Sequence, residues 1–211
     1  MKKVSVIFPE DTKKYLALHC NNKTEAFACL IESEELDKYL QRTPRVTLDI
    51  GSGIGRASVF FFKALGWANT LFILADGDSG NVQFAGMRKG KAEFYNSLKA
   101  TESYCQANGM LKFETFNLEK LALDKLPRKP DLVYSFKALG FHWPLNSFLE
   151  DVYPALAKKC RLIFELRAGN PVTLKWSQQQ IAGIDRDKYD IVGLFLEADR
   201  KSDNFIVLER Q

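Results

Sequence analysis

Short apolar runs alternate with longer segments of helical spacing from Val46 onward, and this alternation predicts most of the fold. The runs are rich in Leu, Ile, Val and Phe, which is typical of strands in a parallel sheet that helices cover. Parallel strands need crossover connections, and the segments between the runs have the apolar spacing of helices. The expected strands are 46–50, 71–75, 111–116, 131–135 and 160–166, and the expected helices are 55–65, 91–108 and 145–157.

The two ends of the chain have different patterns. Two runs near the C-terminus, 189–198 and 204–211, favour strands and are separated by the polar stretch DRKSD, so we expect an antiparallel hairpin there. Near the N-terminus, 24–41 has an interrupted helical face that a proline closes. We therefore expect residues 1–45 to form a helical flank or lid and residues 46–211 to form a single domain.

Composition and charge narrow the possible functions. The chain of 211 residues is 46% hydrophobic, which is enough for one sizeable core. Its 30 basic and 26 acidic side chains leave a formal net charge of +4 without a lysine- or arginine-rich block, so we expect no nucleic-acid partner. No run approaches the roughly 18 apolar residues of a membrane span, and the N-terminus reaches acids and proline too soon for a signal peptide. These patterns predict a cytoplasmic protein that does not bind membranes.

The cysteines give no sign of a metal site. None of them forms a C-x-x-C pair, so neither a zinc site nor a disulfide framework is predicted, and a reducing compartment fits best. They are widely spaced, at Cys20, Cys29, Cys105 and Cys160.

The stretch VTLDIGSGIGR, residues 46–56, holds the main candidate site. A strand that runs into a glycine-rich turn and then a helix presents backbone N–H groups to a ligand, and glycine lets the ligand approach the main chain. The dinucleotide fingerprint requires G-x-G-x-x-G, but here the glycines alternate at Gly51, Gly53 and Gly55, and Arg56 occupies the place of the third fingerprint glycine. Asp49 at the strand end would repel a pyrophosphate and suits a ligand with a cationic group. The pattern therefore disfavours a nicotinamide cofactor.

The run LDIGSGIGR resembles the first motif of class I S-adenosylmethionine-dependent methyltransferases. In that family the acid, here Asp49, faces the amino-acid end of the cofactor, and the glycines let the cofactor's sugar lie against the chain. Asp76, twenty-one residues beyond Gly55, matches the acid that accepts both ribose hydroxyls, a role that suits the two oxygens of a carboxylate. Asn117 in FETFNLEKL matches the position that reaches the adenine amino group. The alternative is structural: the glycines would only form a tight turn and Asp76 would only cap a loop.

The resemblance covers roughly residues 44–211 and implies both a fold and a cofactor. The implied fold is α/β, with a Rossmann-like, seven-stranded, mostly parallel sheet, an antiparallel C-terminal strand and helices on both faces. The implied cofactor is S-adenosylmethionine. The implied cofactor-binding residues follow the first four strands: Asp49, Gly51, Ser52, Gly53, Gly55, Arg56, Asp76, Gly77, Asn117, Leu118 and Ser135.

The segment GFHWP follows the fourth expected strand, where the loops of an open α/β sheet form the binding crevice. His142 is the candidate base for a hydroxyl acceptor, and the alternative is a structural histidine that stacks on Trp143. In the family that the chain resembles, enzymes that methylate nitrogen commonly have an acid or Asn, two prolines and an aromatic at this strand, whereas this chain has YSFK. An oxygen acceptor is therefore favoured. The candidate substrate-binding residues are Tyr95, Trp143, Glu165 and Arg167.

Two short segments, 94–98 (FYNSL) and 141–144 (FHWP), also resemble bacterial sugar O-methyltransferases. We therefore expect an S-adenosylmethionine-dependent methyltransferase that acts on a small-molecule hydroxyl, such as one on a sugar or natural-product precursor, as a monomer or homodimer. Two alternatives stay open: a non-catalytic module that binds S-adenosylmethionine or a nucleotide, and a methyltransferase with a nitrogen acceptor. A nicotinamide oxidoreductase is the alternative from another enzyme class.

Overall fold

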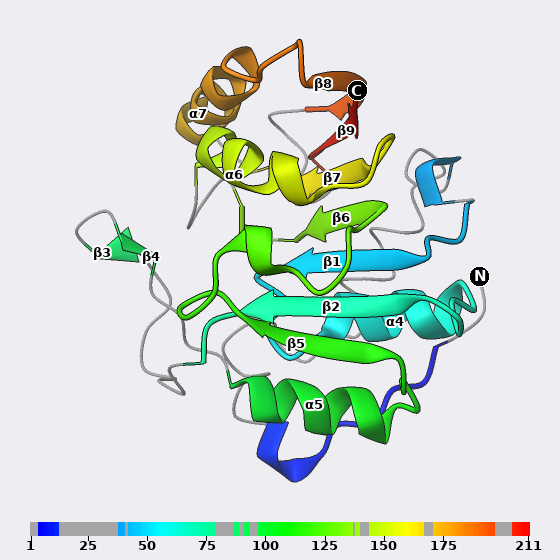
Figure 1. The fold of residues 1–211 in the computed structure, drawn as a ribbon. Helices are drawn as coiled ribbons and strands as arrows, with labels where there is room; N and C mark the ends of the chain where they lie inside the picture. Colours follow the sequence, from blue (N-terminus) through cyan, green and yellow to red (C-terminus); the bar gives the residue numbers. More distant parts are fainter. Residues whose placement is uncertain are drawn as a thin grey trace.

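A seven-stranded sheet forms the centre of the molecule, with the strand order β5-β2-β1-β6-β7-β9-β8 (Figure 1). The computed structural model describes residues 4–12, 38–40, 42–78, 87–88, 91–92, 97–136, 138–139, 144–166, 171–196 and 204–211. The sheet contains β1 (Val46–Ile50), β2 (Leu71–Asp76), β5 (Phe113–Asn117), β6 (Leu132–Ser135), β7 (Arg161–Glu165), β8 (Tyr189–Phe195) and β9 (Phe205–Arg210). The first five of these are parallel, and β9 runs antiparallel to both β7 and β8. The predicted fold class is therefore confirmed.

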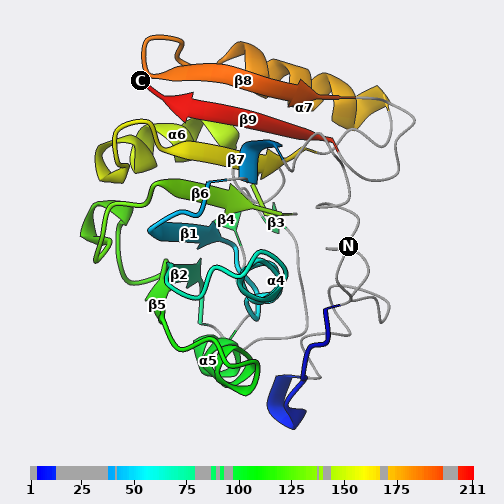
Figure 2. The same ribbon diagram turned by 90° about the vertical axis from the view of Figure 1, so that its right-hand side faces the viewer.

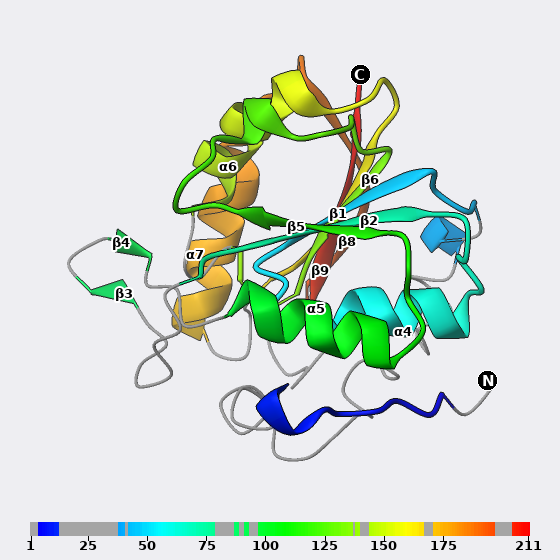
Figure 3. The same ribbon diagram turned by 60° about the horizontal axis from the view of Figure 1, so that its bottom comes forward.

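Helices cover both faces of this sheet (Figure 3). On one face lie α4 (Arg56–Ala64) and α5 (Leu98–Ala107), and on the other lie α6 (Leu145–Val152) and α7 (Pro171–Ala182). The structure also contains three short 3-10 helices, η1 (Glu10–Thr12), η2 (Leu123–Lys125) and η3 (Tyr153–Ala155). A separate two-stranded antiparallel sheet is formed by β3 (Met87–Arg88) and β4 (Lys91–Ala92). The connection from β5 to β6 thus contains η2 where a parallel crossover usually has a helix.

The central strand β1 is buried on both faces, which explains its nearly continuous apolar sequence. Leu48 and Ile50 belong to the core cluster under α6. The alternate side chains, Thr47 and Asp49, are also buried. Because successive strand residues point to opposite faces, Asp49 is directed toward α4. A carboxylate in this position interrupts an otherwise apolar layer.

Two expected helices differ from the structure at their ends. The helix expected over 91–108 begins only at Leu98, because Ser97 caps it by accepting a hydrogen bond from the Ala100 N–H at 3.4 Å. The helix expected over 145–157 ends at Val152 and continues as η3.

The helix α7 was not predicted from the sequence. Its buried residues are Ser177 and Gln180, and Val172 is largely exposed. A helix that buries polar side chains lacks the apolar periodicity on which such predictions depend.

The described N-terminal segment, residues 4–12, lies along α5 (Figure 2). Asn108 at the end of α5 accepts a hydrogen bond from the Ile7 N–H at 2.8 Å and donates one to the Ile7 carbonyl at 2.7 Å. The ring of Phe8 stacks on Tyr104 with centroids 5.2 Å apart. Most of the helix expected over 24–41 lies outside the described residues. Residues 38–40 are the described part of it, and they are helical. Within the described part of the chain, no helix is both long and apolar enough to cross a bilayer.

Candidate functional site

The carboxyl ends of β1, β2, β5 and β6 meet at one edge of the sheet, and the polar residues expected to bind a cofactor follow these strands. Register pairs Asp76 with Asn117 across β2 and β5, and Asp49 with Tyr134 across β1 and β6. Parallel pairing alone thus brings together residues that are far apart in the sequence.

The glycine turn after β1 has a backbone conformation that favours glycine at each alternate position. Gly51, Gly53 and Gly55 have φ angles of 66°, 54° and 83°. A Cβ on Gly51 would overlap the side chain of Ala138, and one on Gly55 would lie 2.6 Å from Leu74 Cδ2. Among the described residues, no atom lies within 4 Å of a Cβ built on Gly53. Packing therefore restricts the first and third glycines, whereas no described side chain restricts the second.

The remaining residues of the turn lie beside these glycines. The Gly51 and Ser52 N–H groups donate to the Ala75 carbonyl at 2.8 and 3.2 Å, which fixes the turn to the end of β2. Arg56 begins α4 and is buried, with its charge close enough to Tyr104 to act on the pKa of that phenol.

Asp76 fastens the glycine turn to β2. One of its carboxylate oxygens accepts the Gly53 N–H and the other accepts the Gly77 N–H, both at 2.7 Å. The pKa of Asp76 is raised to about 7, mainly by burial, with the two N–H donors acting to lower it and the charge of Glu119 acting to raise it. The Asp76 carboxyl group therefore holds the turn, and it is only partly ionised near neutral pH.

Asp49 is the second buried carboxylate at this edge. It is 2% exposed, and Ser58 on α4 donates to its Oδ2 at 2.7 Å. Burial raises the pKa of Asp49 to about 7, and the nearby charge of Asp76 acts in the same direction. Within the described part of the chain, neither Asp49 nor Asp76 is in a salt bridge. The two neighbouring negative charges therefore favour a ligand with a cationic group and hydrogen-bond donors.

Asn117 and Ser135 are the last residues of β5 and β6, the two strands that flank β2 and β1 at this edge. Asn117 accepts the Glu119 N–H through its Oδ1 at 2.9 Å and so shapes the loop after β5. Ser135 is completely buried, donating to the Ile50 carbonyl at 2.7 Å and accepting the Leu139 N–H at 3.3 Å. Its hydroxyl therefore joins β6 to β1.

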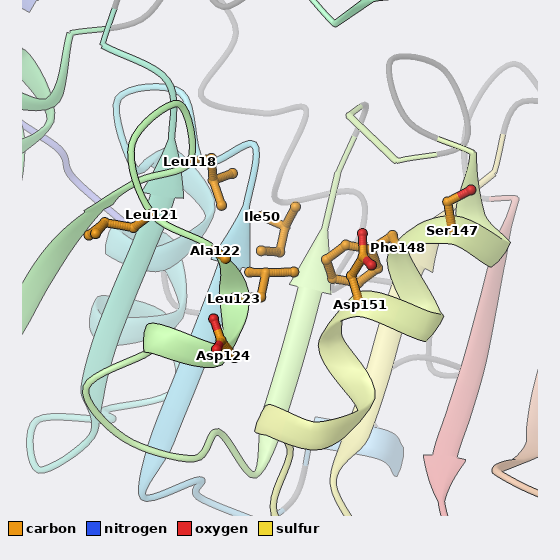
Figure 4. A pocket seen from close by; sticks show the side chains of 9 residues that line it. All are labelled: Ile50, Leu118, Leu121, Ala122, Leu123, Asp124, Ser147, Phe148 and Asp151. Carbon is orange, nitrogen blue, oxygen red and sulfur yellow. The ribbon is translucent and has the colours of Figure 1, made fainter.

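A pocket of about 470 Å³ opens between η2 and α6, next to this edge (Figure 4). Ile50, which precedes Gly51, and Leu118, which follows Asn117, both line it, so the pocket shares its walls with the strand ends described above. Its volume is in the range of small-molecule sites. Figure 4 shows the η2 segment on one side, α6 on the other and Ile50 between them. The other lining residues are Leu121, Ala122, Leu123, Asp124, Ser147, Phe148 and Asp151.

Several expected site residues lie outside the described residues: His142, Trp143, Tyr95 and Arg167. Glu165 is described and stands half-buried at the end of β7.

Sequence reasoning missed two polar residues, Ser58 and Tyr134, which lie behind Asp49. Their contact depends on the strand register and on the placement of α4, which the sequence pattern does not reveal. It also missed the pocket residues on α6, because their approach to the loop after β5 depends on the tertiary fold.

Comparison with known proteins supports the fold through structure alone. No protein-family model matches the chain, and no curated protein matches its sequence. A precorrin-6y C5,15-methyltransferase from Geobacter metallireducens is 16% identical with a TM-score of 0.58, and the match covers 98% of each chain. Cofactor-bound Rv0187 from MTB is 12% identical with a TM-score of 0.58, over 96% of this chain and 97% of the other. A candidate rRNA-methylase from Clostridium thermocellum is 11% identical with a TM-score of 0.52, over 79% of this chain and 86% of the other.

The last of these similarities corrects one prediction made from charge. The chain was expected to act on a small molecule without nucleic-acid partners, and that exclusion is wrong, because the same fold occurs in a candidate rRNA-methylase. A net charge summed over a whole chain gives the average field, whereas binding of nucleic acid depends on where the charges gather.

The strand order and the reversed last strand agree with these structural similarities. The resemblance seen in the sequence is thereby confirmed at the level of the fold. The chain has the fold of class I S-adenosylmethionine-dependent methyltransferases.

Proposed function

We propose that the chain is a methyltransferase that binds S-adenosylmethionine at the carboxyl ends of β1, β2 and β5. The observation that carries this proposal is the pair of buried carboxylates, Asp49 and Asp76, on either side of a glycine turn. S-adenosylmethionine offers a cationic amino group, a sulfonium and a ribose diol, which complement two negative charges that have no salt bridge among the described residues.

The residues present fit this cofactor. Asp76 uses one lone pair of each oxygen on the turn, and a carboxylate oxygen has a second for a ribose hydroxyl. No described side chain comes within 4 Å of a Cβ built on Gly53, which supports an approach of the sugar to the main chain there. The apolar side chains that line the pocket, among them Ile50, Leu118 and Phe148, suit the faces of an adenine ring, and Asn117 directly precedes Leu118 in the chain. Asp49 would face the amino-acid end, as its place in the motif implies.

The cofactor supplies an electrophilic methyl group when it is bound, so the protein has to hold the acceptor in line and exclude water. A hydroxyl acceptor on a small molecule, such as a sugar or natural-product precursor, is the finer part of the proposal. It is supported by the YSFK sequence, which stands where nitrogen-methylating enzymes of the family that the chain resembles commonly have an acid or Asn, two prolines and an aromatic. In this proposal His142 takes the acceptor's proton. Tyr95, Trp143, Glu165 and Arg167 would contact the acceptor, and residues 46–211 would form the transferase domain with 1–45 as its flank.

Binding of S-adenosylhomocysteine, measured by titration calorimetry, tests the cofactor site. We expect Asp76→Ala to abolish binding, because it removes the acceptor of the ribose diol and the anchor of Gly53. Asp131→Ala is the matched control: Asp131 also accepts two backbone N–H groups, from Arg45 and Val46, but at the opposite edge of the sheet. Equal loss of binding in both variants, or no binding to the unaltered protein, would contradict the proposal.

Methyl transfer is tested with radiolabelled S-adenosylmethionine and parallel panels of small-molecule alcohols, amines and total RNA. Label that enters an alcohol, and enters it more slowly with His142→Ala, supports the hydroxyl proposal. Label in an amine or in RNA would reassign the acceptor. Cofactor binding without transfer to any acceptor would favour a regulatory binding module.

A further inference from the structure

Asp49 is the end of a buried row of three polar side chains that come from three different elements. Asp49 on β1 and Tyr134 on β6 are register partners on neighbouring parallel strands, so their side chains leave the sheet on the same face. Ser58 projects from α4 over both of them. Its Oγ lies 2.7 Å from Asp49 Oδ2 and 2.7 Å from the Tyr134 hydroxyl. Asp49 is 2% exposed and the other two are completely buried, so water does not replace any of these contacts.

The direction of the hydrogen bonds in this row depends on the charge of Asp49. An ionised carboxylate only accepts, so the Ser58 hydroxyl must donate to it, and the free lone pairs of Ser58 then accept the proton of Tyr134. Both hydroxyl dipoles point toward the negative charge in this arrangement. Hydrogen bonds in series strengthen one another in a medium of low dielectric constant. The row is therefore built to stabilise the ionised form of Asp49 against the cost of burial.

Resting on the proposed function, we propose that Ser58 and Tyr134 are positioning residues that hold Asp49 in place and favour its ionised form, whose charge attracts the cationic amino-acid end of the cofactor. The row gives the site its preference for ligands with an ammonium group over nucleosides that lack one. Ser58 and Tyr134 are completely buried, so both would act on the cofactor through Asp49 and not by direct contact.

Other titratable groups act around Asp49 from the neighbouring elements. Asp76 on β2 opposes the ionised form through its negative charge. Cys105 on α5 and Tyr134 on β6 are buried, and the charge of Asp49 helps to raise the pKa of each well above its usual range, so both stay protonated near neutral pH. Of these described groups, the two carboxylates are the ones that change charge between about pH 5 and about pH 8, and the hydroxyl row acts on one of them.

The test compares the pH dependence of ligand binding in Ser58→Ala and Tyr134→Phe with that of the unaltered protein. The ligands are S-adenosylhomocysteine, which carries the ammonium, and methylthioadenosine, which lacks it. Between about pH 5.5 and about pH 9, affinity for S-adenosylhomocysteine should rise and level off as Asp49 ionises. Loss of the direct donor in Ser58→Ala should move the midpoint up by about one pH unit, which is about a tenfold loss of affinity below the midpoint. Tyr134→Phe should move it in the same direction by less.

Three controls separate this role from a general loss of structure. Tyr189→Phe removes another buried hydroxyl, one that donates to the Leu149 carbonyl at 2.7 Å on the opposite face of the sheet, and should leave the midpoint unchanged. Ser58→Thr retains the hydroxyl and should restore the original midpoint. Affinity for methylthioadenosine should be the same in all variants.

The possible outcomes distinguish the two proposals. An unmoved midpoint in Ser58→Ala and Tyr134→Phe, or an equal loss of methylthioadenosine affinity, would overturn the positioning role while leaving the cofactor proposal standing. If Ser58→Ala does not fold, Tyr134→Phe decides alone, because it keeps the aromatic ring. Failure of the unaltered protein to bind S-adenosylhomocysteine at any pH would instead overturn the proposed function.

Discussion

The buried carboxylate of Asp49 should make the protein without ligand less stable as the pH rises. Burial raises the pKa of Asp49 from 3.8 to about 7, so between these values the folded state keeps a proton that the unfolded state has released. Stability must therefore fall from about pH 4 to about pH 7 and then level off. Each pKa unit corresponds to about 1.36 kcal/mol, so the ionised Asp49 costs at most about 4 kcal/mol of folding free energy above pH 7.

Asp49→Asn removes this charge while keeping the shape and the acceptor for Ser58. We expect the variant to be more stable than the unaltered protein by about 2–4 kcal/mol above pH 7, the lower value allowing for the buried N–H groups of the new amide. Near pH 4 this gain should vanish, so the variant should be as stable as the unaltered protein or, where the buried amide N–H groups cost the difference, less stable by up to about 2 kcal/mol. The free energy of unfolding, from urea titrations at several pH values, measures the difference.

The control for this experiment is Asp190→Asn, which removes an exposed carboxylate on β8 and should give no such dependence. A stability difference that stays constant with pH, or an Asp49→Asn protein that is less stable above pH 7, would refute the reasoning. The same variant should bind S-adenosylhomocysteine more weakly, because the charge that destabilises the fold is the one proposed to attract the ligand.

Two further changes test the turn and the N-terminal segment. Gly55→Ala should lower the free energy of unfolding by about 2–3 kcal/mol more than Gly53→Ala, because both positions have positive φ but, among the described residues, a Cβ on Gly55 alone meets a side chain. Equal losses in chemical denaturation would show that packing at Gly55 does not matter. Asn108→Ala should lower the free energy of unfolding by about 1–2 kcal/mol, because it removes both hydrogen bonds to Ile7. It should also speed proteolytic cleavage within residues 4–12. Unchanged cleavage would show that these bonds do not hold the segment.

The sequence was sufficient to predict the elements whose pattern reflects their burial. β1 and β2 are central strands, and their apolar runs mark them almost to the residue. The glycine turn was predictable because positive φ angles at alternate positions leave a direct trace in the residue types. α7 left no such trace, because the side chains that it buries are Ser177 and Gln180.

The candidate site was predictable only where one short segment contains all its parts. Asp49 could be assigned from the motif, but the residues behind it could not, because the contact of Ser58 with Tyr134 requires both the strand register and the placement of α4. The pocket beside Leu118 depends in the same way on the approach of two segments that lie apart in the chain.

The short turn η2 has a consequence for how this site can change. The loop between β5 and β6 forms one wall of the pocket, while the sheet and α6 form the others. Surface loops accept insertions and deletions far more readily than strands do. Lengthening or shortening residues 118–126 would therefore resize the pocket without disturbing a single strand pairing, which makes this loop the natural place to alter the size of ligand that the protein admits.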